Sequence, residues 1–367
     1  MSLALSAAQD EGSGDRKIAD VPTDGRRPLR PPVPLAQRAT CGGAHRRAFF
    51  TIGSRTEERT VHHLQLSRTV DAKPITEWKS VAVELLGTQT RIVRGPKYRH
   101  RVIEAGSSGD ALVLIHGIGG HAETFARNLH NLVGAGFHVF AVDALFHGYS
   151  SWEPYVDDGR AARQAEGVVD LLDGLGIERA HVEGESMGAT IAFEFGMNHP
   201  ERAGKIIMNT GFGDVVLTKT DFAEQPNGGV IGELSRRALL EPTFRNVRAR
   251  MEWLVASPER MTDEMVEIRR RLYSDPGVFN SMKRVFRVGT DWETKPRWTE
   301  EQVRNFTPEA LVFWTEHNPG EGPDYGEYVA SLLPDAAYYC MADAAHWPQW
   351  ERPEEHDQVL IDFIAGS

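Results

Sequence analysis

The feature that most constrains this fold is a Gly-Glu-Ser-Met-Gly motif at residues 184–188, because of the segments on either side of it. A short strand-like run at residues 180–183 precedes the motif, and residues 189–199 have the composition of a helix. A serine on a sharp strand-to-helix turn projects its hydroxyl above the sheet, and the flanking glycines relieve the crowding of that turn. The arrangement therefore predicts Ser186 as a nucleophile at one edge of an α/β sheet.

A second motif offers the hydrogen-bond donors that such a serine needs. Residues 111–115 are all apolar, which is typical of a buried strand, and lead directly into His-Gly-Ile-Gly-Gly at residues 116–120. A glycine-rich turn leaves backbone N–H groups free, so we assign the amides of Ile118 and Met187 to a developing oxyanion. The alternatives are a plain strand-ending turn or a phosphate cradle, although the Lys-Ser/Thr ending of a P-loop is absent.

The candidate base lies near the C-terminus. Residues 337–341 predict a last short strand, and residues 353–364 predict a helix with proline in its first turn. His346 lies in the loop between them. A serine hydroxyl is a poor nucleophile at its ordinary pKa, so Ser186 needs an imidazole within hydrogen-bond reach, and His346 can supply it.

Together these motifs resemble those of α/β-hydrolases, and more closely those of the meta-cleavage product hydrolases, which split carbon–carbon bonds in ring-opened aromatics. The likeness spans roughly residues 78–367 and is most specific in His-Trp-Pro-Gln-Trp-Glu at residues 346–351. It implies an α/β-hydrolase fold, with a mostly parallel sheet, helices on both faces and an inserted helical cap. Strand and helix patterns alternate accordingly, after a leading antiparallel pair expected at residues 81–93 and 98–104.

The same alternation divides the chain into segments. We assign residues 76–214 and 306–367 to the α/β core, and residues 215–305, where prolines and glycines interrupt several helices, to the cap. Residues 1–75 are rich in Arg, Pro, Ser and Gly and are expected to be a disordered extension, serving as a docking arm or marking an over-extended start site.

Substrate contacts are expected from the cap. Residues 261–269 resemble a family motif whose arginine binds the substrate carboxylate, and apolar residues at helical spacing over 261–272 place Arg269 at the edge of one face. A planar guanidinium there grips a carboxylate with two parallel hydrogen bonds. The alternative is a solvated basic cluster, because two further arginines follow. The resemblance also implies substrate contacts from Trp347 and Gly117.

The chain departs from the family at the residue that orients the histidine. After the strand at residues 310–314 the family carries an aspartate, and the matching residue here is Asn318. An amide oxygen can accept a hydrogen bond from the imidazole, but it cannot stabilise imidazolium as a carboxylate does. Three carboxylates remain as alternatives for this third member of the triad, namely Asp214, Glu316 and Asp324.

These motifs indicate a serine hydrolase that acts on a small organic substrate through an acyl-enzyme or an oxyanion intermediate. The resemblance favours hydrolysis of a carbon–carbon bond in a ring-fission 2-hydroxy-6-oxo-dienoate. A carboxylesterase for aryl or phthalate-type esters is the alternative, because Glu185 and Thr124 stand where the carbon–carbon hydrolases usually have asparagines. A non-catalytic ligand-binding homologue is the second alternative, since Asn318 weakens the triad.

The composition limits which binding partners and which cellular compartment are expected for the protein. The formal net charge of −11, with no concentrated basic face beyond the leading segment, argues against nucleic acid. No apolar run approaches the ~18 residues of a membrane span. Two isolated thiols, Cys41 and Cys340, favour a reducing cytoplasm and indicate neither a disulfide framework nor a metal site. Neither reaction implies a metal or an organic cofactor, and a homo-oligomer is possible.

Overall fold

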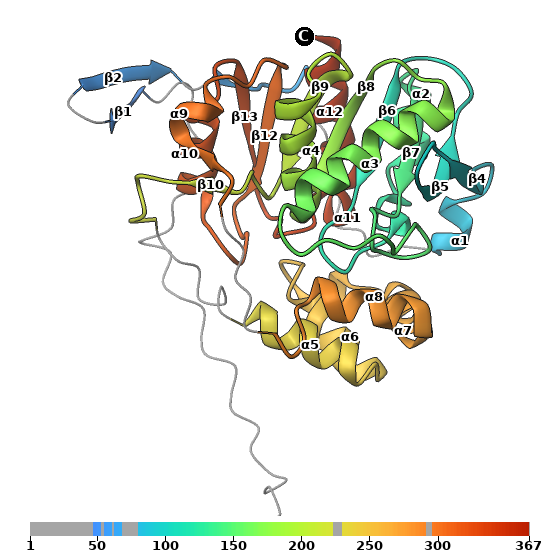
Figure 1. Ribbon diagram of the computed structural model, residues 1–367. Coiled ribbons are helices and arrows are strands. Elements are labelled where there is room, and N and C mark those ends of the chain that lie inside the picture. Colours follow the sequence, from blue (N-terminus) through green and yellow to red (C-terminus); the bar gives the residue numbers. More distant parts are fainter. Residues whose placement is uncertain are drawn as a thin grey trace, which may run out of the picture. The chain divides into compact units, whose positions relative to one another are not determined.

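A computed structural model describes most of the chain and leaves the leading residues 1–46 outside the described part (Figure 1). The described residues are 47–52, 55–60, 62–67, 80–222, 230–290 and 296–366. Most of the extension expected over residues 1–75 therefore lies outside them. The described part of that segment contains three strands: β1 (Arg47–Ile52) pairs antiparallel with β2 (Arg55–Thr60), and β3 (His62–His63) joins the central sheet.

The central sheet confirms the predicted architecture. In the described part of the chain its nine strands run in the order β3-β13-β12-β9-β8-β6-β7-β5-β4. The strands after β3 are β4 (Gln89–Arg94), β5 (Arg99–Ala105), β6 (Ala111–Ile115), β7 (His138–Val142), β8 (Ala180–Glu185), β9 (Ala203–Asn209), β12 (Ala310–Thr315) and β13 (Ala336–Met341). All pairings among β6, β7, β8, β9, β12 and β13 are parallel, whereas β5 pairs antiparallel with both β4 and β7. The leading antiparallel pair is thus present, but it starts later than expected because residues 81–84 form a helix.

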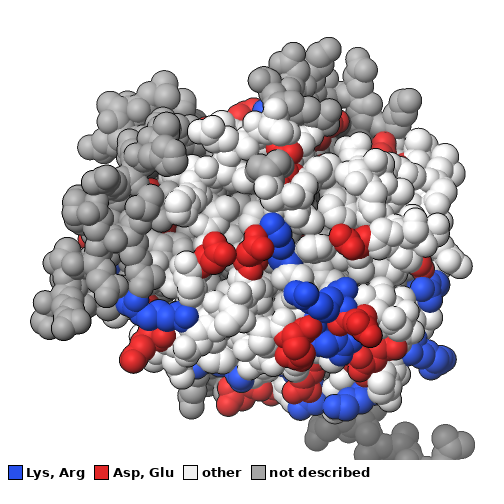
Figure 2. Space-filling model, turned by 90° about the horizontal axis from the view of Figure 1, so that it is seen from above, with Lys and Arg blue, Asp and Glu red and all other residues white. Residues whose placement is uncertain are grey.

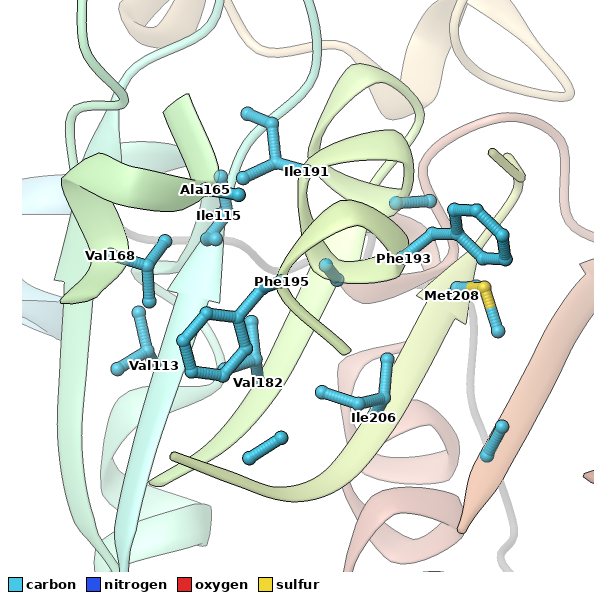
Figure 3. Packing of buried hydrophobic residues seen from close by; sticks show 14 of the residues in the cluster. Val113, Ile115, Ala165, Val168, Val182, Ile191, Phe193, Phe195, Ile206 and Met208 are labelled. Atoms are coloured by element: carbon cyan, nitrogen blue, oxygen red, sulfur yellow. The ribbon is translucent and has the colours of Figure 1, made fainter. Parts of the chain in front are cut away.

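Helices cover both faces of the sheet because the central strands are apolar on both sides. In β6, Val113 and Ile115 pack in one core cluster, together with residues of α3 (Arg160–Leu175), α4 (Met187–Asn198) and α10 (Pro323–Leu332), as Figure 3 shows for α3 and α4. Leu112 and Leu114 point to the other face, where they join residues of α2 (Leu129–Gly134) and α12 (Pro353–Ala365). Burial on both faces is what a parallel strand in an α/β sheet requires.

Between β9 and β12 the chain leaves the sheet and forms a group of helices (Figure 1). These are α5 (Ile231–Leu240), α6 (Phe244–Glu252), α7 (Asp263–Ser274) and α8 (Pro276–Val285), with a short parallel pair β10 (Val215–Val216) and β11 (Trp298–Thr299) and the helix α9 (Glu300–Val303). Thr243, Thr262 and Asp275 cap α6, α7 and α8 with side-chain oxygens. We call α5–α8 the cap helices. The remaining short helices are α1 (Val81–Glu84), η2 (Ala122–Phe125), η3 (Pro258–Arg260) and α11 (Pro348–Glu351).

Hydrogen bonds join the cap helices to the loops at the carboxyl ends of the strands. The Tyr273 hydroxyl donates to the carbonyl of Gly119 at 3.3 Å, and the Trp347 amide donates to the carbonyl of Leu254 at 3.1 Å. The Ser281 hydroxyl donates to the carbonyl of Phe146 at 2.7 Å. The cap helices therefore lie directly over the two loops that carry the predicted oxyanion turn and His346.

Three properties bear on partners and compartment. The expectation that Cys340 is an isolated thiol is wrong, because Cys340 is disulfide-bonded, so the cysteines no longer favour a reducing compartment. A search of the described residues found no helix that is both long and apolar enough to cross a membrane. On the face seen in Figure 2, basic and acidic side chains lie next to each other in mixed groups.

Candidate active site

The serine motif forms the sharp turn that its glycines predict. Ser186 has φ 56° and ψ −114°, a region that residues other than glycine seldom occupy, and it is held there by hydrogen bonds at both backbone groups. Its N–H donates to the carbonyl of Asn209 at 2.8 Å, and its carbonyl accepts from Ala189 at 2.9 Å. A Cβ on Gly184 would lie 1.9 Å from the Gly188 carbonyl oxygen, so the close approach of β8 and α4 requires glycine there.

The predicted oxyanion donors are both unoccupied. Among the residues described, the N–H groups of Ile118 and Met187 donate to no protein acceptor. Met187 is the first residue of α4, where an amide has no partner within the helix. A cavity of about 180 Å³ reaches both residues, with Gln164 and Asp214 also on its wall. The two amides are therefore available to a bound carbonyl oxygen.

Both backbone groups of Gly117 form hydrogen bonds within the protein. Its N–H donates to Glu185 Oε2 at 2.6 Å, and its carbonyl accepts from Gly120 N–H at 2.9 Å. A Cβ on Gly117 would lie 2.6 Å from each oxygen of the Glu185 carboxyl group. The backbone N–H of Gly117 thus holds Glu185 in place, and the substrate contact expected at Gly117 stays a prediction.

His346 contacts the residue that matches the family aspartate. Its Nδ1 lies 2.7 Å from Asn318 Oδ1, and Asn318 Nδ2 donates to the carbonyl of Glu321 at 2.9 Å. Because the amide nitrogen is committed to Glu321, the oxygen faces the imidazole, and Nδ1 must carry the proton. Nε2 is then the unprotonated nitrogen, as a general base requires. The Glu321 carbonyl thus selects the tautomer that an unconstrained amide would leave open.

None of the three alternative carboxylates contacts His346 in the described part of the structure. Asp214 lines the cavity beside Met187, and Glu316 accepts a hydrogen bond from the Asp343 amide at 3.2 Å. Asp324 lies in the first turn of α10. Asn318 is therefore the side chain that the structure places against the outer nitrogen of the imidazole.

Glu185 is closer to the reacting groups than the motif suggested. Its Oε1 lies 3.5 Å from His346 Nε2, and its side chain is only 2% exposed. Burial raises the pKa of Glu185 to about 7, although the Gly117 amide and two arginines act in the opposite direction. No hydrogen bond joins Ser186 Oγ to His346 among the described contacts, and Glu185, which precedes Ser186 in the chain, is the residue that lies beside the imidazole.

The imidazole of His346 is held in its neutral form. Burial first, and then the positive charge of Arg250, lowers the pKa of His346 to about 3. The side chain is 13% exposed, and the Trp253 ring packs edge-on against it with the centroids 5.7 Å apart. A neutral imidazole with a free Nε2 is the state that accepts a proton from a serine hydroxyl.

Arg269 differs from its two neighbours, as the helical spacing predicted. Arg269 is 2% exposed, whereas Arg270 and Arg271 both pair with Glu267 at the surface of α7. The guanidinium of Arg269 lies 5.9 Å from the centroid of the Trp347 ring, and its Nε and Nη2 atoms are buried without a hydrogen-bond partner. Buried donors without acceptors are rare in folded proteins, so this guanidinium is placed to receive an anion.

Two residues near the site escaped motif reasoning, Arg250 and Trp253. The missed signal lies in α6, where Val247, Met251 and Leu254 form a buried stripe at helical spacing and Arg250 falls inside that stripe. A charged residue within an apolar stripe is unusual, because burying an unpaired charge is costly. Within the described ranges no group of three or more His, Cys, Asp or Glu is placed to hold a metal ion.

Asn318 offers a direct test of the tautomer argument. We expect Asn318→Ala to lower kcat about 10- to 100-fold, the loss of one strong hydrogen bond, because Nδ1 loses the acceptor that keeps it protonated. The measurement is kcat against pH for purified variant and wild type. Glu316→Gln is the matched control, since its side chain points to Asp343, and it should leave kcat unchanged. Equal activity of Asn318→Ala and wild type would contradict the assignment.

The chain is similar in sequence and in fold to several known proteins. The profile of the family described as alpha/beta hydrolase fold matches residues 110–353. The chain is 30% identical over 268 residues to a 2-hydroxy-6-oxo-6-phenylhexa-2,4-dienoate hydrolase of Comamonas testosteroni, covering 71% of this chain and 89% of that protein. It is 29% identical over 282 residues to a 2-hydroxy-6-oxononadienedioate/2-hydroxy-6-oxononatrienedioate hydrolase of Paraburkholderia xenovorans, again covering 71% and 89%. The solved structure of a 2-hydroxy-6-oxo-6-phenylhexa-2,4-dienoate hydrolase from Rhodococcus has a TM-score of 0.62 and 22% identity, over 76% of this chain and 100% of that one.

Proposed function

We propose a function from one premise: this chain belongs to the α/β-hydrolase fold family, among the meta-cleavage product hydrolases. The protein is accordingly a hydrolytic enzyme. Its proposed reaction is hydrolysis of a carbon–carbon bond in a ring-fission 2-hydroxy-6-oxo-dienoate, with Ser186 and His346 as the catalytic pair. The observation that carries this proposal is the contact of His346 with Asn318 and with Glu185, the residue before Ser186, together with the unbonded amides of Ile118 and Met187 and a buried Arg269 that has no ion pair.

The proposed reaction proceeds in four steps, in which Ser186, His346 and the two backbone amides have separate roles. The substrate dienol first becomes a ketone, which turns the carbon next to the scissile carbonyl into a stabilised leaving group. The carbonyl oxygen accepts hydrogen bonds from the amides of Ile118 and Met187, where negative charge develops. Ser186 adds to the carbonyl carbon as His346 Nε2 takes its proton, and that proton passes to the departing carbon. Water then releases the acyl group as a carboxylic acid.

The substrate is held by the cap in this proposal. Arg269 receives the carboxylate of the dienoate, and Trp347 packs beside it, since the guanidinium lies 5.9 Å from that ring. The names of the two curated relatives, both dienoate hydrolases, support the same substrate class for this chain. No step requires a metal or an organic cofactor.

A carboxylesterase is the second candidate, and Glu185 is the observation that favours it. An ionised carboxyl group 3.5 Å from His346 Nε2 repels an anionic substrate such as a dienoate and does not repel a neutral ester. In this alternative Ser186 attacks an ester carbonyl, His346 returns the proton to the departing alcohol, and water clears the acyl-enzyme.

One substrate comparison tests the proposed function. The purified enzyme is offered a ring-fission 2-hydroxy-6-oxo-dienoate and a neutral aryl ester, and products are identified by mass spectrometry. Release of two acids from the dienoate, with a higher kcat/KM than for the ester, supports the proposal. Cleavage of the ester alone supports the carboxylesterase. A fluorophosphonate probe that fails to label Ser186 would instead favour the non-catalytic homologue.

Arg269 provides a second prediction at the same site. We expect Arg269→Gln to lower kcat/KM for the dienoate about 10- to 100-fold, the range for a lost charge-assisted hydrogen bond, and to affect a neutral ester far less. The control is Arg271→Gln, because that side chain is 79% exposed and pairs with Glu267 at the surface. Steady-state kinetics on both substrates decide the matter, and an equal loss on the ester would show that Arg269 does not bind a carboxylate.

A further inference from the structure

A second buried arginine lies in the cap without an acidic partner. Arg250 in α6 is 4% exposed, and its Nε donates to the Ser235 hydroxyl at 2.9 Å. Its Nη1 is buried and has no hydrogen-bond partner. Of the carboxylates in the described ranges, none forms an ion pair with Arg250 or with Arg269. Arg248, two residues away on the same helix, instead pairs with Glu252 at 2.7 Å.

Contacts connect Arg250 to the reacting groups. Its guanidinium lies 5.6 Å from the centroid of the Trp253 ring, and that ring packs against His346 with the centroids 5.7 Å apart. The charge of Arg250 lowers the pKa of His346 after burial does, and it also acts on Glu185. Arg250 therefore faces the catalytic centre across one aromatic side chain.

Glu185 interacts with the charges of these arginines only from a distance and forms no ion pair with either. Its carboxyl group is held by the Gly117 amide at 2.6 Å and lies beside His346, without an ion pair to Arg250 or Arg269. One carboxyl group also cannot balance two guanidinium charges. A buried cation that keeps its charge without a partner is costly to the folded protein, and a bound anion offsets that cost.

The two arginines repel each other, so bound negative charge would stabilise both. Burial lowers the pKa of Arg250 to about 10, an effect that Arg269 adds to and that Tyr273 and Glu185 oppose, and the guanidinium stays charged near neutral pH. Each has at least one donor nitrogen free, Nη1 in Arg250 and both Nε and Nη2 in Arg269. A guanidinium recognises a carboxylate through such parallel donors.

We propose that Arg250 is a second anion-binding residue of the catalytic pocket, so that the preferred substrate carries two carboxylates. One carboxylate pairs with Arg269, and the second, at the other end of the substrate, pairs with Arg250. This inference rests on the proposed function, in which Arg269 receives the dienoate carboxylate. It adds a specificity: a substrate that ends in a carboxylate is preferred over one that ends in a neutral ring.

The kinetic test compares two ring-fission dienoates, one ending in a carboxylate and one ending in a phenyl ring. Wild type should prefer the dicarboxylate, chiefly through a lower KM. Arg250→Gln should reduce the ratio of kcat/KM for the two substrates about 10- to 100-fold. Arg248→Gln, a surface change on the same helix, should leave that ratio unchanged. An Arg250→Gln variant that loses activity equally on both substrates would overturn the proposal, because a merely structural arginine or a general effect on His346 predicts that outcome.

A binding test separates this inference from the proposed reaction. The Ser186→Ala protein is titrated calorimetrically with glutarate and with butyrate, which differ in the second carboxylate. Glutarate should bind at least about tenfold more tightly, and Ser186→Ala combined with Arg250→Gln should abolish that difference. If wild type cleaves neither dienoate but this preference persists, the proposed reaction fails and the second anion site stands. Equal affinities for glutarate and butyrate would refute the site, whatever the reaction.

Discussion

Replacing Ser186 with alanine is expected to lower kcat by roughly 10⁴- to 10⁶-fold without unfolding the protein. Alanine keeps the Cβ atom and both backbone hydrogen bonds that hold the turn, to Asn209 and from Ala189. Only the hydroxyl is lost, and with it the group that attacks the carbonyl. Residual turnover above the uncatalysed rate would come from the amides of Ile118 and Met187, which still stabilise an oxyanion.

The measurement is single-turnover kinetics on whichever substrate the wild type cleaves, with circular dichroism to verify folding. Ser274→Ala is the matched control, because it makes the same chemical change at an exposed hydroxyl that donates to the Arg270 carbonyl. That variant should retain full activity. If Ser186→Ala keeps more than about a tenth of wild-type kcat, the serine is not the nucleophile, and Glu185 becomes the carboxyl group to test as a base.

Replacing Glu183 with glutamine is expected to cost roughly 3–5 kcal/mol of stability, the range measured when one partner of a buried ion pair is removed. Glu183 in β8 is fully buried, and its Oε1 accepts from His356 Nε2 at 2.7 Å and from Asn209 Nδ2 at 2.9 Å. His356 Nδ1 lies 3.1 Å from Asp357 Oδ1. An imidazole between two carboxylates is doubly protonated, so a neutral glutamine leaves a buried cation less well compensated.

The same pair predicts how stability depends on pH. Burial alone would lower the pKa of His356, but the charge of Glu183 and the hydrogen bond that His356 donates to Asp357 outweigh it and raise the pKa to about 9. A raised histidine pKa contributes stability that is complete below the unfolded value of about 6.5 and is lost as pH rises through the folded value. The free-energy difference between wild type and Glu183→Gln should therefore be larger at about pH 6 than at about pH 9.5.

Urea unfolding at both pH values measures this difference. Glu233→Gln is the control, because Glu233 pairs with Arg236 on the surface with 73% of its side chain exposed, and it should change stability by less than about 0.5 kcal/mol. A difference that stays constant from low to high pH would mean that His356 is neutral in the folded protein.

Much of the fold was predictable from local patterns. Residues 111–115 are apolar at every position, and the structure has β6 with the same bounds. The glycines at 184 and 188 predicted a turn that the structure forms through contacts that exclude any side chain. The segment over residues 81–84 was less readable: Ser80 caps a short helix there, and valine-rich runs do not distinguish a strand from one helical turn.

Candidate site residues could be predicted from the sequence where they belong to a recognisable motif. Contacts made by the folded chain, which set the orientation of side chains, could not. No sequence pattern near Asn318 predicts that its amide nitrogen donates to the Glu321 carbonyl, because that hydrogen bond depends on how the loop folds. Likewise no local pattern predicts that the Gly117 N–H donates to Glu185, 68 positions away. Arg250 escaped notice since only the stripe around it, and no motif, distinguishes it from surface arginines.

The short strand β3 has a consequence for any redesign of the chain. Residues 62–63 lie along β13, the Leu64 amide donates to the Tyr338 carbonyl at 2.9 Å, and Ser67 binds Asp362 of α12 through both its N–H and its hydroxyl at 2.8 Å. β13 and α12 lie on either side of the loop that carries His346. Residues 62–67 thus contact the elements before and after the loop of His346, the proposed base, although they lie far from it in the sequence. A deletion or a fusion junction within residues 62–67 would therefore remove contacts to both elements.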